Sequence, residues 1–570
     1  MKLKLIDKFS DLNPQLFREI KGRLKSRNVA IASGISILGQ LILLGAYANR
    51  LPDPHKGYPR DYCLESFYNK SSAQYTCLTD RLGQALINWD LWWVDIFLWL
   101  SFVAVFALFV AGSYMLIGDL AKEERRGTLN FIRVSPRSTQ TILLGKLLGV
   151  PILLYLSVFL AIPLHLWAGL SAHIPLGFIL GFDAALVAGC IFFYSAAILF
   201  GLSTAYLGGF QAWLGSGLVF GCVAFTSLKT EQYSDPVLHG PIDWLNLFNP
   251  AMLLPSFISQ DLPTLVEANR YFNYDKLASW QWFYSPLGAS VVSILGLMLL
   301  NYCLWTYWIW QSLSRRFPNP SATIISKRQS YNLVACIQLM MLGFALQQST
   351  DSSHYNFIES FFENLCWILS LNLVLFFGLM AVLSPHRQTV QDWARYSQTN
   401  KFKSLWKDLI WGEKSPAPVA IALNALFCAG LLVPWILIWP EEAPKTAALA
   451  GLPLFVTVII IYAVVAQLML LIKTQKRSLW AAGTVGTLIA LPILVGAVLT
   501  LEPSEQPLLW LFSAVSWATT EYISLNYLLF GFLGQVAILT GLSVFLKRRV
   551  DRLGESATQA LLKAGKMPTA

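Results

Sequence analysis

The 570-residue sequence is poor in charge: charged residues make up only 13% of it, whereas hydrophobic residues make up 55%. A soluble globular domain carries about 25% charged residues. A soluble protein with an ordinary core cannot account for this deficit. A membrane protein can, because its lipid-facing surface is apolar as well. The low charge therefore indicates a polytopic membrane protein.

Several other patterns are missing. The long apolar runs do not alternate with polar residues, which argues against a transmembrane β-barrel. The six histidines form no metal-like pair with each other or with cysteine, and no catalytic triad or carboxylate pair stands out. The pair Gly145–Lys146 does not complete a P-loop, because Gln140 replaces its first glycine and Leu147 its Ser or Thr. We therefore expect no enzyme activity, metal site or nucleotide site in this chain.

Twelve apolar runs are each long enough to cross a membrane, since a spanning helix needs about 20 apolar residues. The predicted fold is an all-α polytopic membrane protein with about twelve transmembrane helices. The runs occupy residues 29–49, 91–118, 147–170, 175–206, 210–227, 286–312, 331–347, 357–384, 417–439, 448–472, 480–501 and 525–546. The first 28 residues are basic and polar, and the first run is already long enough to span, so no cleavable signal peptide is expected.

Positive charge is concentrated on one side of this topology. With an even number of spans both termini share one side, and the segments predicted there hold 33 of the 42 Lys and Arg residues but only 11 of the 32 Asp and Glu residues. The positive-inside rule makes that side the cytoplasm. The net charge of +10 is thus a topology signal spread over separate loops, and binding to nucleic acid is not expected. We expect the membrane to be the bacterial plasma membrane.

The spans divide into two halves of six with the same layout. In each half two spans enclose an external loop, a charged cytoplasmic stretch follows, and an external segment precedes the last span. The expected parts are an interface region (1–28), a first half (29–312), a linker (313–330), a second half (331–546) and a basic tail (547–570). The external segments, at about 228–284 and 501–521, are expected to hold short re-entrant helices that dip back into the membrane.

The interface region contains a predicted amphipathic helix. Asn13 is a plausible N-cap, and Pro14 stands at the first helical position. The apolar residues that share one face are Leu12, Leu16, Phe17, Ile20 and Leu24, with basic residues largely elsewhere. This pattern predicts a basic helix on the cytoplasmic surface of the membrane, in contact with lipid.

A charged stretch, KEERRGTLNFIRVSPRSTQTILLGK at residues 122–146, separates the second and third spans and carries eight charges. One charge at mid-bilayer costs about 2.5–3.5 kcal/mol on insertion scales, so this stretch is a connection outside the membrane. Leu129 and Ile132 fall on one face of a short helix, which Pro136 ends. A second helix is expected to begin near Ser138. Such a short helix is suited to docking on a soluble partner.

This stretch resembles the loop signature of ABC-2 type transporter permeases. In that family a Glu precedes Gly-Thr-Leu, a Ser/Thr-Pro follows, and a Gly-Lys opens the third span. The matching residues are Glu123, Gly127, Thr128, Leu129, Ser135, Pro136, Gly145 and Lys146, at the family's spacing, with Arg126 beside them. Asn130 departs from the pattern, because an acidic residue is common there. The resemblance covers residues 1–312.

The resemblance implies a permease driven by separate ABC ATPase subunits that dock on this loop and supply the ATP hydrolysis. It implies export of lipids, glycans, drugs or peptides, although a fold does not identify a substrate. The second half matches the layout only: its loop offers Glu413 and Ser415–Pro416 without Gly-Thr-Leu or Gly-Lys. Whether a second permease chain completes the pathway is left open.

Two other functions compete with this interpretation. A secondary transporter of the major facilitator type also has two six-span halves, and Gly118, Leu120 and Ala121 fit its loop pattern. Lys122 stands where that pattern has an Asp, however, and the external re-entrant segments have no place in that fold. A membrane anchoring protein without transport activity would leave the signature unexplained.

Three further residues are candidates for a site. Cys63 and Cys77 lie in the first external loop, where oxidation to a disulfide can occur. Asp183 is an acid inside a predicted span, and such residues are functional candidates. It lies within about two helical turns of the external end, so an interfacial position is favoured.

Overall fold

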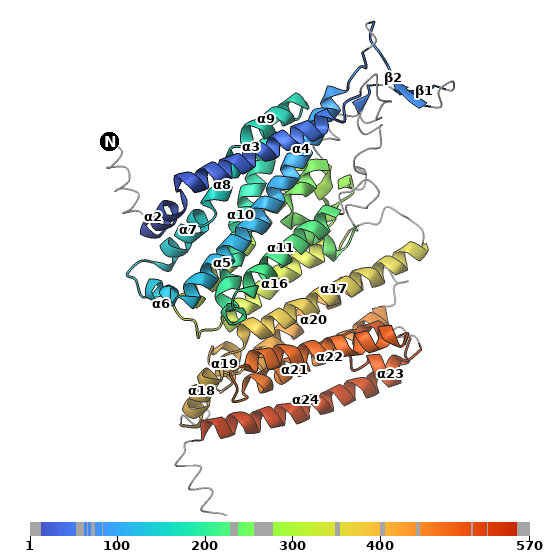
Figure 1. Ribbon diagram of the computed structural model, residues 1–570. Coiled ribbons are helices and arrows are strands. Elements are labelled where there is room, and N and C mark those ends of the chain that lie inside the picture. Colours follow the sequence, from blue (N-terminus) through green and yellow to red (C-terminus); the bar gives the residue numbers. More distant parts are fainter. Residues whose placement is uncertain are drawn as a thin grey trace, which may run out of the picture. The chain divides into compact units, whose positions relative to one another are not determined.

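The structure is a computed structural model of the whole chain (Figure 1). It describes residues 13–52, 62–64, 66–69, 74–81, 84–228, 238–255, 277–347, 354–399, 405–439, 445–502, 505–520 and 522–555. Leu12 of the predicted amphipathic face, much of both predicted external segments, and the tail from residue 556 lie outside these residues. The described chain is mostly helical, with two small two-stranded sheets, which agrees with the predicted all-α membrane protein.

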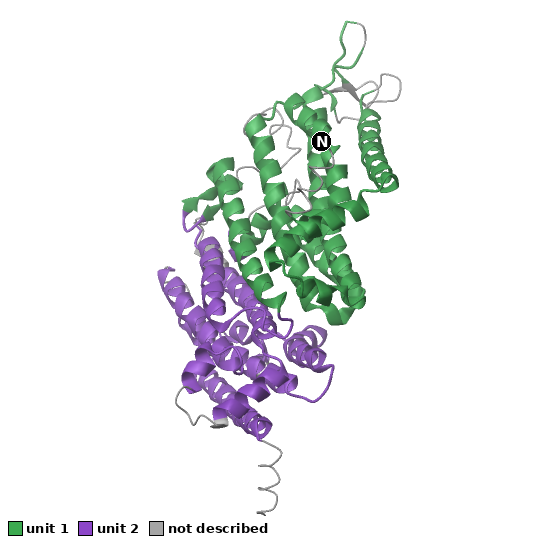
Figure 2. Cartoon of the chain, turned by 90° about the vertical axis from the view of Figure 1, so that its left-hand side faces the viewer, with its two compact units in different colours: residues 1–238, 243–281, 285–318 green, residues 239–242, 282–284, 319–570 purple. Residues whose placement is uncertain are grey.

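The chain forms two compact units (Figure 2). The first comprises residues 1–238, 243–281 and 285–318, and the second comprises residues 239–242, 282–284 and 319–570. The boundary at 318 falls within the predicted linker, but the linker is shorter than predicted, because helices on both sides extend into it. The division into two halves of six spans stays a prediction.

In unit 1 the helices follow the predicted order. They are α2 (Pro14–Arg23), α3 (Ser26–Ala48), α4 (Trp89–Phe106), the π-helical turn η2 (Ala107–Ala111), α5 (Gly112–Arg125), α6 (Thr128–Arg133), α7 (Thr139–Gly149), α8 (Ile152–Phe159), α9 (Ile162–Ser171), α10 (Leu176–Ser203), η3 (Ala205–Leu207), α11 (Phe210–Leu228) and α15 (Val291–Arg316). The strands β1 (Ser66–Asn69) and β2 (Gln74–Cys77) lie between α3 and α4.

Local signals placed the start of α2 correctly. The Asn13 side chain accepts a hydrogen bond from the Leu16 amide, and Pro14 is the first helical residue.

The second span is longer than predicted, because α4, η2 and α5 run on as one helical segment from Trp89 to Arg125. Residues 122–125 are therefore helical and do not belong to the loop. Within the π-helical turn the Leu108 carbonyl accepts a hydrogen bond from the Tyr194 hydroxyl on α10 at 2.8 Å.

Short helices also occur where the first external segment was predicted. They are η4 (Pro241–Phe248) and η5 (Pro250–Leu253), followed after the undescribed residues by β3 (Gln281–Trp282), β4 (Ser285–Pro286) and η6 (Leu287–Ala289). The residues of η5 are all buried. Within unit 1, η5 packs against α10 and α4.

In unit 2 the elements are α16 (Lys327–Phe344), α17 (His354–Leu383), α18 (Arg387–Thr399), α19 (Leu405–Trp411), α20 (Pro418–Ile438), α21 (Lys445–Leu470), α22 (Arg477–Val498), α23 (Pro507–Trp510), η7 (Ser516–Thr519) and α24 (Leu525–Gly554). The core of this unit lies around α21, which packs against α20, α22 and α24. Its buried residues are mainly aliphatic and aromatic.

Eleven helices among the described residues are long and apolar enough to cross a membrane, one fewer than the twelve predicted. The difference is the predicted span at 331–347. These residues are helical in α16, but charged and amide side chains lower its hydropathy. Its 18 residues extend about 27 Å, close to the thickness of the hydrocarbon core.

The polar residues of α16 face protein. Gln338 donates to the Asn372 side chain on α17, and Ser330 accepts from Asn424 on α20 at 3.0 Å. Lys327, with only 2% of its surface exposed, donates to the Leu409 carbonyl at 2.8 Å and to the Ser415 hydroxyl at 2.6 Å. These contacts explain how a helix of low hydropathy packs inside the unit, because each buried polar group is hydrogen-bonded.

Lys327 makes the stability of the protein depend on pH. Burial lowers the pKa of Lys327 to about 7 from its ordinary 10.5, while the nearby Asp408 opposes this shift. The folded protein therefore binds fewer protons than the unfolded chain between these two values, and stability rises with pH across that window. We expect the Lys327→Met variant in detergent to lose this rise in melting temperature. Lys414→Met, which removes an exposed lysine nearby, should keep it. Equal pH profiles for the two variants would contradict this role.

Candidate functional site

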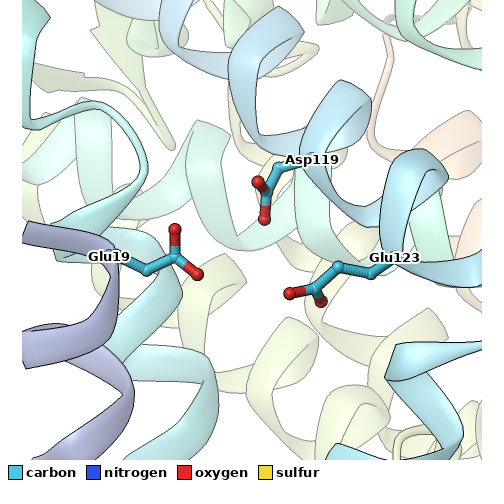
Figure 3. Close-up of side chains that lie close together, drawn as sticks. All are labelled: Glu19, Asp119 and Glu123. Carbon is cyan, nitrogen blue, oxygen red and sulfur yellow. The ribbon is translucent and has the colours of Figure 1, made fainter. Parts of the chain in front are cut away.

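The ammonium of Lys146, on α7, lies among three carboxylates at one end of unit 1. Its Nζ atom is 2.8 Å from Asp119 Oδ2, 2.7 Å from Glu123 Oε2 and 3.8 Å from Glu19 Oε1. Lys146 is completely buried. Asp119 and Glu123 are four residues apart on α5, so they share one face, and Glu19 approaches from α2. Figure 3 shows the three carboxylates pointing toward one another.

Two arginines of α2 complete this ion cluster, which consists of Arg18, Glu19, Arg23, Asp119, Glu123 and Lys146. Arg18 Nη2 lies 2.6 Å from Glu123 Oε1, and Arg23 Nη2 lies 2.6 Å from Asp119 Oδ1. Three positive charges thus balance three negative ones. The carboxylates are close enough together to hold a metal ion. Because Lys146 and the arginines already neutralise them, we do not assign a metal here.

Two glycines of α7 allow α2 to approach closely. A Cβ atom on Gly145 would lie 2.8 Å from both the Asn13 side chain and the Leu16 amide nitrogen, and one on Gly149 would lie 2.5 Å from Glu19 Cβ. Asn13 also donates to the Thr141 carbonyl at 2.8 Å. The close approach brings Glu19 to the ion cluster, and it explains why small residues stand one turn apart on α7.

A left-handed residue separates α5 from α6. Gly127 has φ +69°, a conformation that a residue with a side chain rarely adopts. The short α6 then buries Leu129 and Ile132, whereas Phe131 and Val134 are 83% and 85% exposed. As predicted, the chain turns at Pro136, and Ser138 caps α7 by accepting from the Thr141 amide. Phe131 on α6 and Val134 at its C-cap thus present two apolar side chains outward.

A groove of about 230 Å³ lies beside these exposed side chains. Its lining comes from α2, α6, α7 and the turn between α6 and α7, and includes Pro14, Arg18, Phe131, Arg137 and Thr141. Arg18 belongs to both the groove and the ion cluster. A molecule bound in the groove would therefore contact the side chain that pairs with Glu123.

Most of the sequence-predicted loop residues come together here. Glu123, Gly145 and Lys146 take part in the ion cluster and its packing, and Leu129 is on the buried face of α6. Arg126 and Thr128 are exposed at the junction of α5 and α6, and Thr128 donates to the Glu123 carbonyl at 3.2 Å. These contacts give the residues of the signature physical roles within one small region.

Sequence reasoning missed the partners from α2 and the second acid of α5. Glu19 is the single acid of a helix that is otherwise basic, and Asp119 stands one turn before Glu123. Both acids can be picked out in the sequence, but nothing in the sequence indicates that Glu19 and Asp119 lie next to each other in the fold. Asp119 was also recognisable as an acid at the end of an apolar run.

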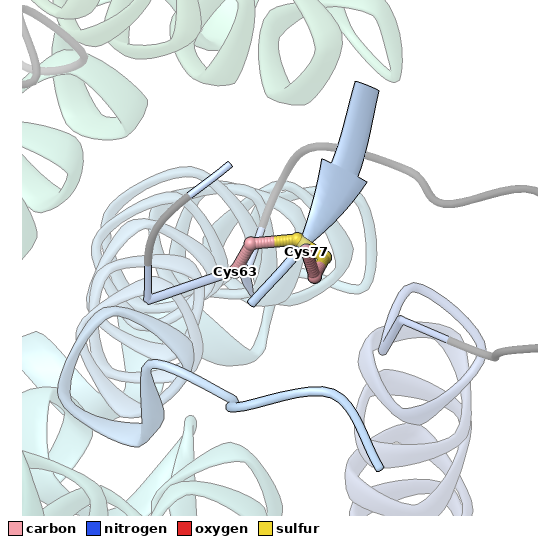
Figure 4. Close-up of a disulfide and its surroundings, with 2 residues drawn as sticks. All are labelled: Cys63 and Cys77. Carbon is pink, nitrogen blue, oxygen red and sulfur yellow. A yellow bond between two sulfur atoms is a disulfide. The ribbon is translucent and has the colours of Figure 1, made fainter. Parts of the chain in front are cut away.

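The other two sequence-predicted sites lie apart from the ion cluster. The structure joins Cys63 and Cys77 in a disulfide, with their Cα atoms 5.5 Å apart (Figure 4). Asp183 lies on α10, where its carboxylate is 4.0 Å from the His165 ring. It is not the only acid within a predicted span: Asp95, on α4, accepts a hydrogen bond from the Tyr62 hydroxyl.

The fold identifies the chain as a multi-pass membrane protein, on the basis of its long apolar helices. Comparisons of the chain with protein-family models, with curated proteins and with solved structures found no match. A more specific function is therefore inferred from the geometry of the ion cluster and α6, together with the residues of the loop signature.

Removal of Lys146 should destabilise unit 1. The Lys146→Met variant leaves three neighbouring carboxylates with too few cations, and loss of one partner from a buried ion pair costs about 3–5 kcal/mol. We expect a clearly lower melting temperature in detergent. Lys122→Met, which removes an exposed lysine at the end of α5, serves as the control. Equal melting of the two variants would show that the cluster does not support the fold.

The disulfide predicts a specific labelling result. Under non-reducing, denaturing conditions, Cys63 and Cys77 should resist alkylation, because their sulfur atoms are bonded to each other. Mass spectrometry should then find two additional alkylated thiols per chain after reduction. Alkylation of both cysteines without reductant would show that the bond does not form in the membrane-inserted protein.

Proposed function

We propose that the chain is the membrane permease of an ABC-2 type exporter, and that separate ATPase subunits dock on α6. The observation that carries this proposal is the assembly of the signature residues. Glu123 and Lys146 form an ion pair of 2.7 Å, Gly145 admits α2, and Gly127 turns the chain into α6. A solvated loop would not need these residues at this spacing.

The connections of α6 suit it to receive motion. It joins α5 through Gly127 and α7 through the turn at Pro136. Because the ion cluster ties α5, α7 and α2 together, a push on α6 would move all three as one group. Since α5 continues through the π-helical turn η2 into α4 as one helical segment, the motion would reach the second span along its length. ATP hydrolysis in the partner would in this way drive alternating access.

The exposed side chains support a protein partner at this place. Phe131 and Val134 are apolar and almost fully exposed, and the groove beside them carries Arg18 and Arg137. Exposed apolar patches rimmed by polar residues are typical of protein interaction sites. An ATPase surface with a protruding apolar side chain would contact Phe131 and Val134, and acidic residues beside it would pair with Arg18 and Arg137.

The proposed orientation places α2, α6 and both termini in the cytoplasm of a bacterial plasma membrane. It requires α16 to cross the membrane as a twelfth span, which its length permits. In unit 2 two helices, α18 and then the short α19, follow α17 before the next long helix, and α19 exposes Trp406. We propose that α19 provides an unequal second docking position.

Substitutions on α6 should uncouple the partner while leaving the fold intact. We expect the double variant Phe131→Ser, Val134→Ser to lose co-purification of a P-loop ATPase in mild detergent, because both side chains are exposed and contribute little to the core. Transport-coupled ATP hydrolysis in proteoliposomes should fall at least about tenfold, which corresponds to roughly 1.4 kcal/mol of lost binding.

Gln140→Ala, an exposed change on α7 outside the groove lining, is the matched control. The melting temperatures of both variants should equal that of the wild type. An ATPase that binds the double variant as tightly as the wild type would overturn the docking role. A purified chain that transports its cargo without any ATPase would overturn the proposed function as a whole.

A further inference from the structure

The last turns of α24, in unit 2, carry a dense group of positive charge. Four of six consecutive residues there are basic: Lys547, Arg548, Arg549 and Arg552. All four are exposed, and among the described residues none of them has an ion-pair partner. Asp551 is the one acid within these six residues, so an excess of three positive charges remains. We call this group the basic end of α24.

The basic end continues a lipid-facing stripe of the same helix. Ile538, Phe545 and Arg552 follow one another at intervals of seven residues, so they lie on one face of α24. The Ile538 and Phe545 side chains are 46% and 48% exposed, as expected of apolar groups that contact lipid. The Arg549 guanidinium lies over the Phe545 ring, 5.3 Å from its centroid. The stripe thus changes from apolar to basic where the helix leaves its apolar run.

The opposite face of this helix end packs on protein and directs the arginines outward. The end of α24 lies against α18 (Figure 1). Val550 belongs to a buried cluster with Trp393 on α18 and Leu471 just after α21. Val550 stands two residues from both Arg548 and Arg552, which is about 200° around the helix. The two arginines therefore point away from the protein.

The turn between α21 and α22 adds charge at the same end of the unit. It begins at Leu471, which shares the buried cluster with Val550. Lys473 and Lys476 are exposed in this turn, and Trp480, in the first turn of α22, is 61% exposed. Tryptophan at the end of a spanning helix is typical of the boundary between lipid tails and headgroups. Two separate segments thus bring cations to this boundary.

The positive-inside rule alone does not account for this arrangement. That rule requires only that lysine and arginine lie in the loops on one side of the membrane. Here the cations stand on a helix, and they extend the stripe that faces lipid in the preceding turns. A lipid whose acyl chain contacts Phe545 would place its phosphate about one to two turns further along α24, beside Arg549 and Arg552.

We propose that the basic end of α24 and the turn between α21 and α22 bind the headgroup of an anionic phospholipid. The arginines donate hydrogen bonds to its phosphate oxygens, and the lysines of the turn attract its negative charge. Four or more basic residues directly beside a spanning helix are typical of anionic lipid binding. This inference requires only that the chain spans a membrane, and it goes beyond the proposed docking of an ATPase on α6.

Photo-crosslinking of the full chain in phosphatidylcholine nanodiscs tests this surface. The discs contain a small fraction of a lipid with a diazirine in its acyl chain, which is either phosphatidylglycerol or phosphatidylcholine. Mass spectrometry of peptides then locates the labelled residues. We expect the phosphatidylglycerol probe to label residues 541–552 at least about tenfold more than the phosphatidylcholine probe, because several cations attract its headgroup. The difference should shrink as salt screens the charges.

Two variants with the same change in net charge separate this surface from a general effect of positive charge. The first replaces the arginines of the basic end: Arg548→Gln, Arg549→Gln and Arg552→Gln. The second is the control and replaces three exposed cations near α6: Lys122→Gln, Arg126→Gln and Arg137→Gln. We expect the tenfold preference at residues 541–552 to fall to about twofold or less in the first variant and to stay unchanged in the control.

A third variant, with lysine at the same three positions of α24, keeps the charge and should keep most of the preference. Melting temperatures show whether each variant is folded. Equal labelling by the two probes in the wild type, an unchanged preference in the folded glutamine variant, or an equal loss in the control would overturn the proposal. So would a segment that neither probe labels, because protein would then cover it, or displacement of the probe by soluble glycerol phosphate. Since no ATPase is present, these outcomes are independent of the proposed function.

Discussion

The contact of the Lys146 ammonium with three carboxylates determines how α2, α5 and α7 are arranged in unit 1. Without a buried cation, Glu19, Asp119 and Glu123 would repel one another at their short separation. Glu19 reaches this position only because glycines on α7 let α2 lie directly against it. Close packing and charge balance therefore depend on each other, and the rest of this end of the unit, including the position of α6, follows from both.

A buried ion cluster is weak evidence for high stability, because its attraction must offset the cost of removing charges from water. The ion cluster does favour one specific arrangement of these helices, since any helix shift that moves a charge away from its partner is costly. Under the proposed function this property is useful. A partner that pushes α6 meets a connected group of helices, and Arg18 links the groove directly to that group.

In unit 2 the buried polar side chains of α16 are satisfied by hydrogen bonds to neutral groups. Its α16 carries Ser330 and Gln338, which hydrogen-bond to side chains on neighbouring helices, and Lys327 faces oxygens of α19 and the residues after it. These contacts involve neutral partners in place of carboxylates. They also explain why α16 has a lower hydropathy than the other long helices. A helix whose polar side chains face protein can be more polar than one that faces lipid.

Sequence by itself determined the membrane class, the order of the long helices, the N-cap at Asn13 and the turn at Pro136, although the second and last long helices run seven and eight residues beyond their predicted ends. These features follow from local rules: an apolar run of sufficient length must form a helix in lipid, and capping residues act within one turn. Tertiary structure alone decided that Glu19 meets Glu123 and Lys146, and that Leu471 and Val550 share one buried cluster. Those residues lie far apart along the chain, and which of them meet depends on helix packing and on the room that glycines leave, neither of which a local pattern records.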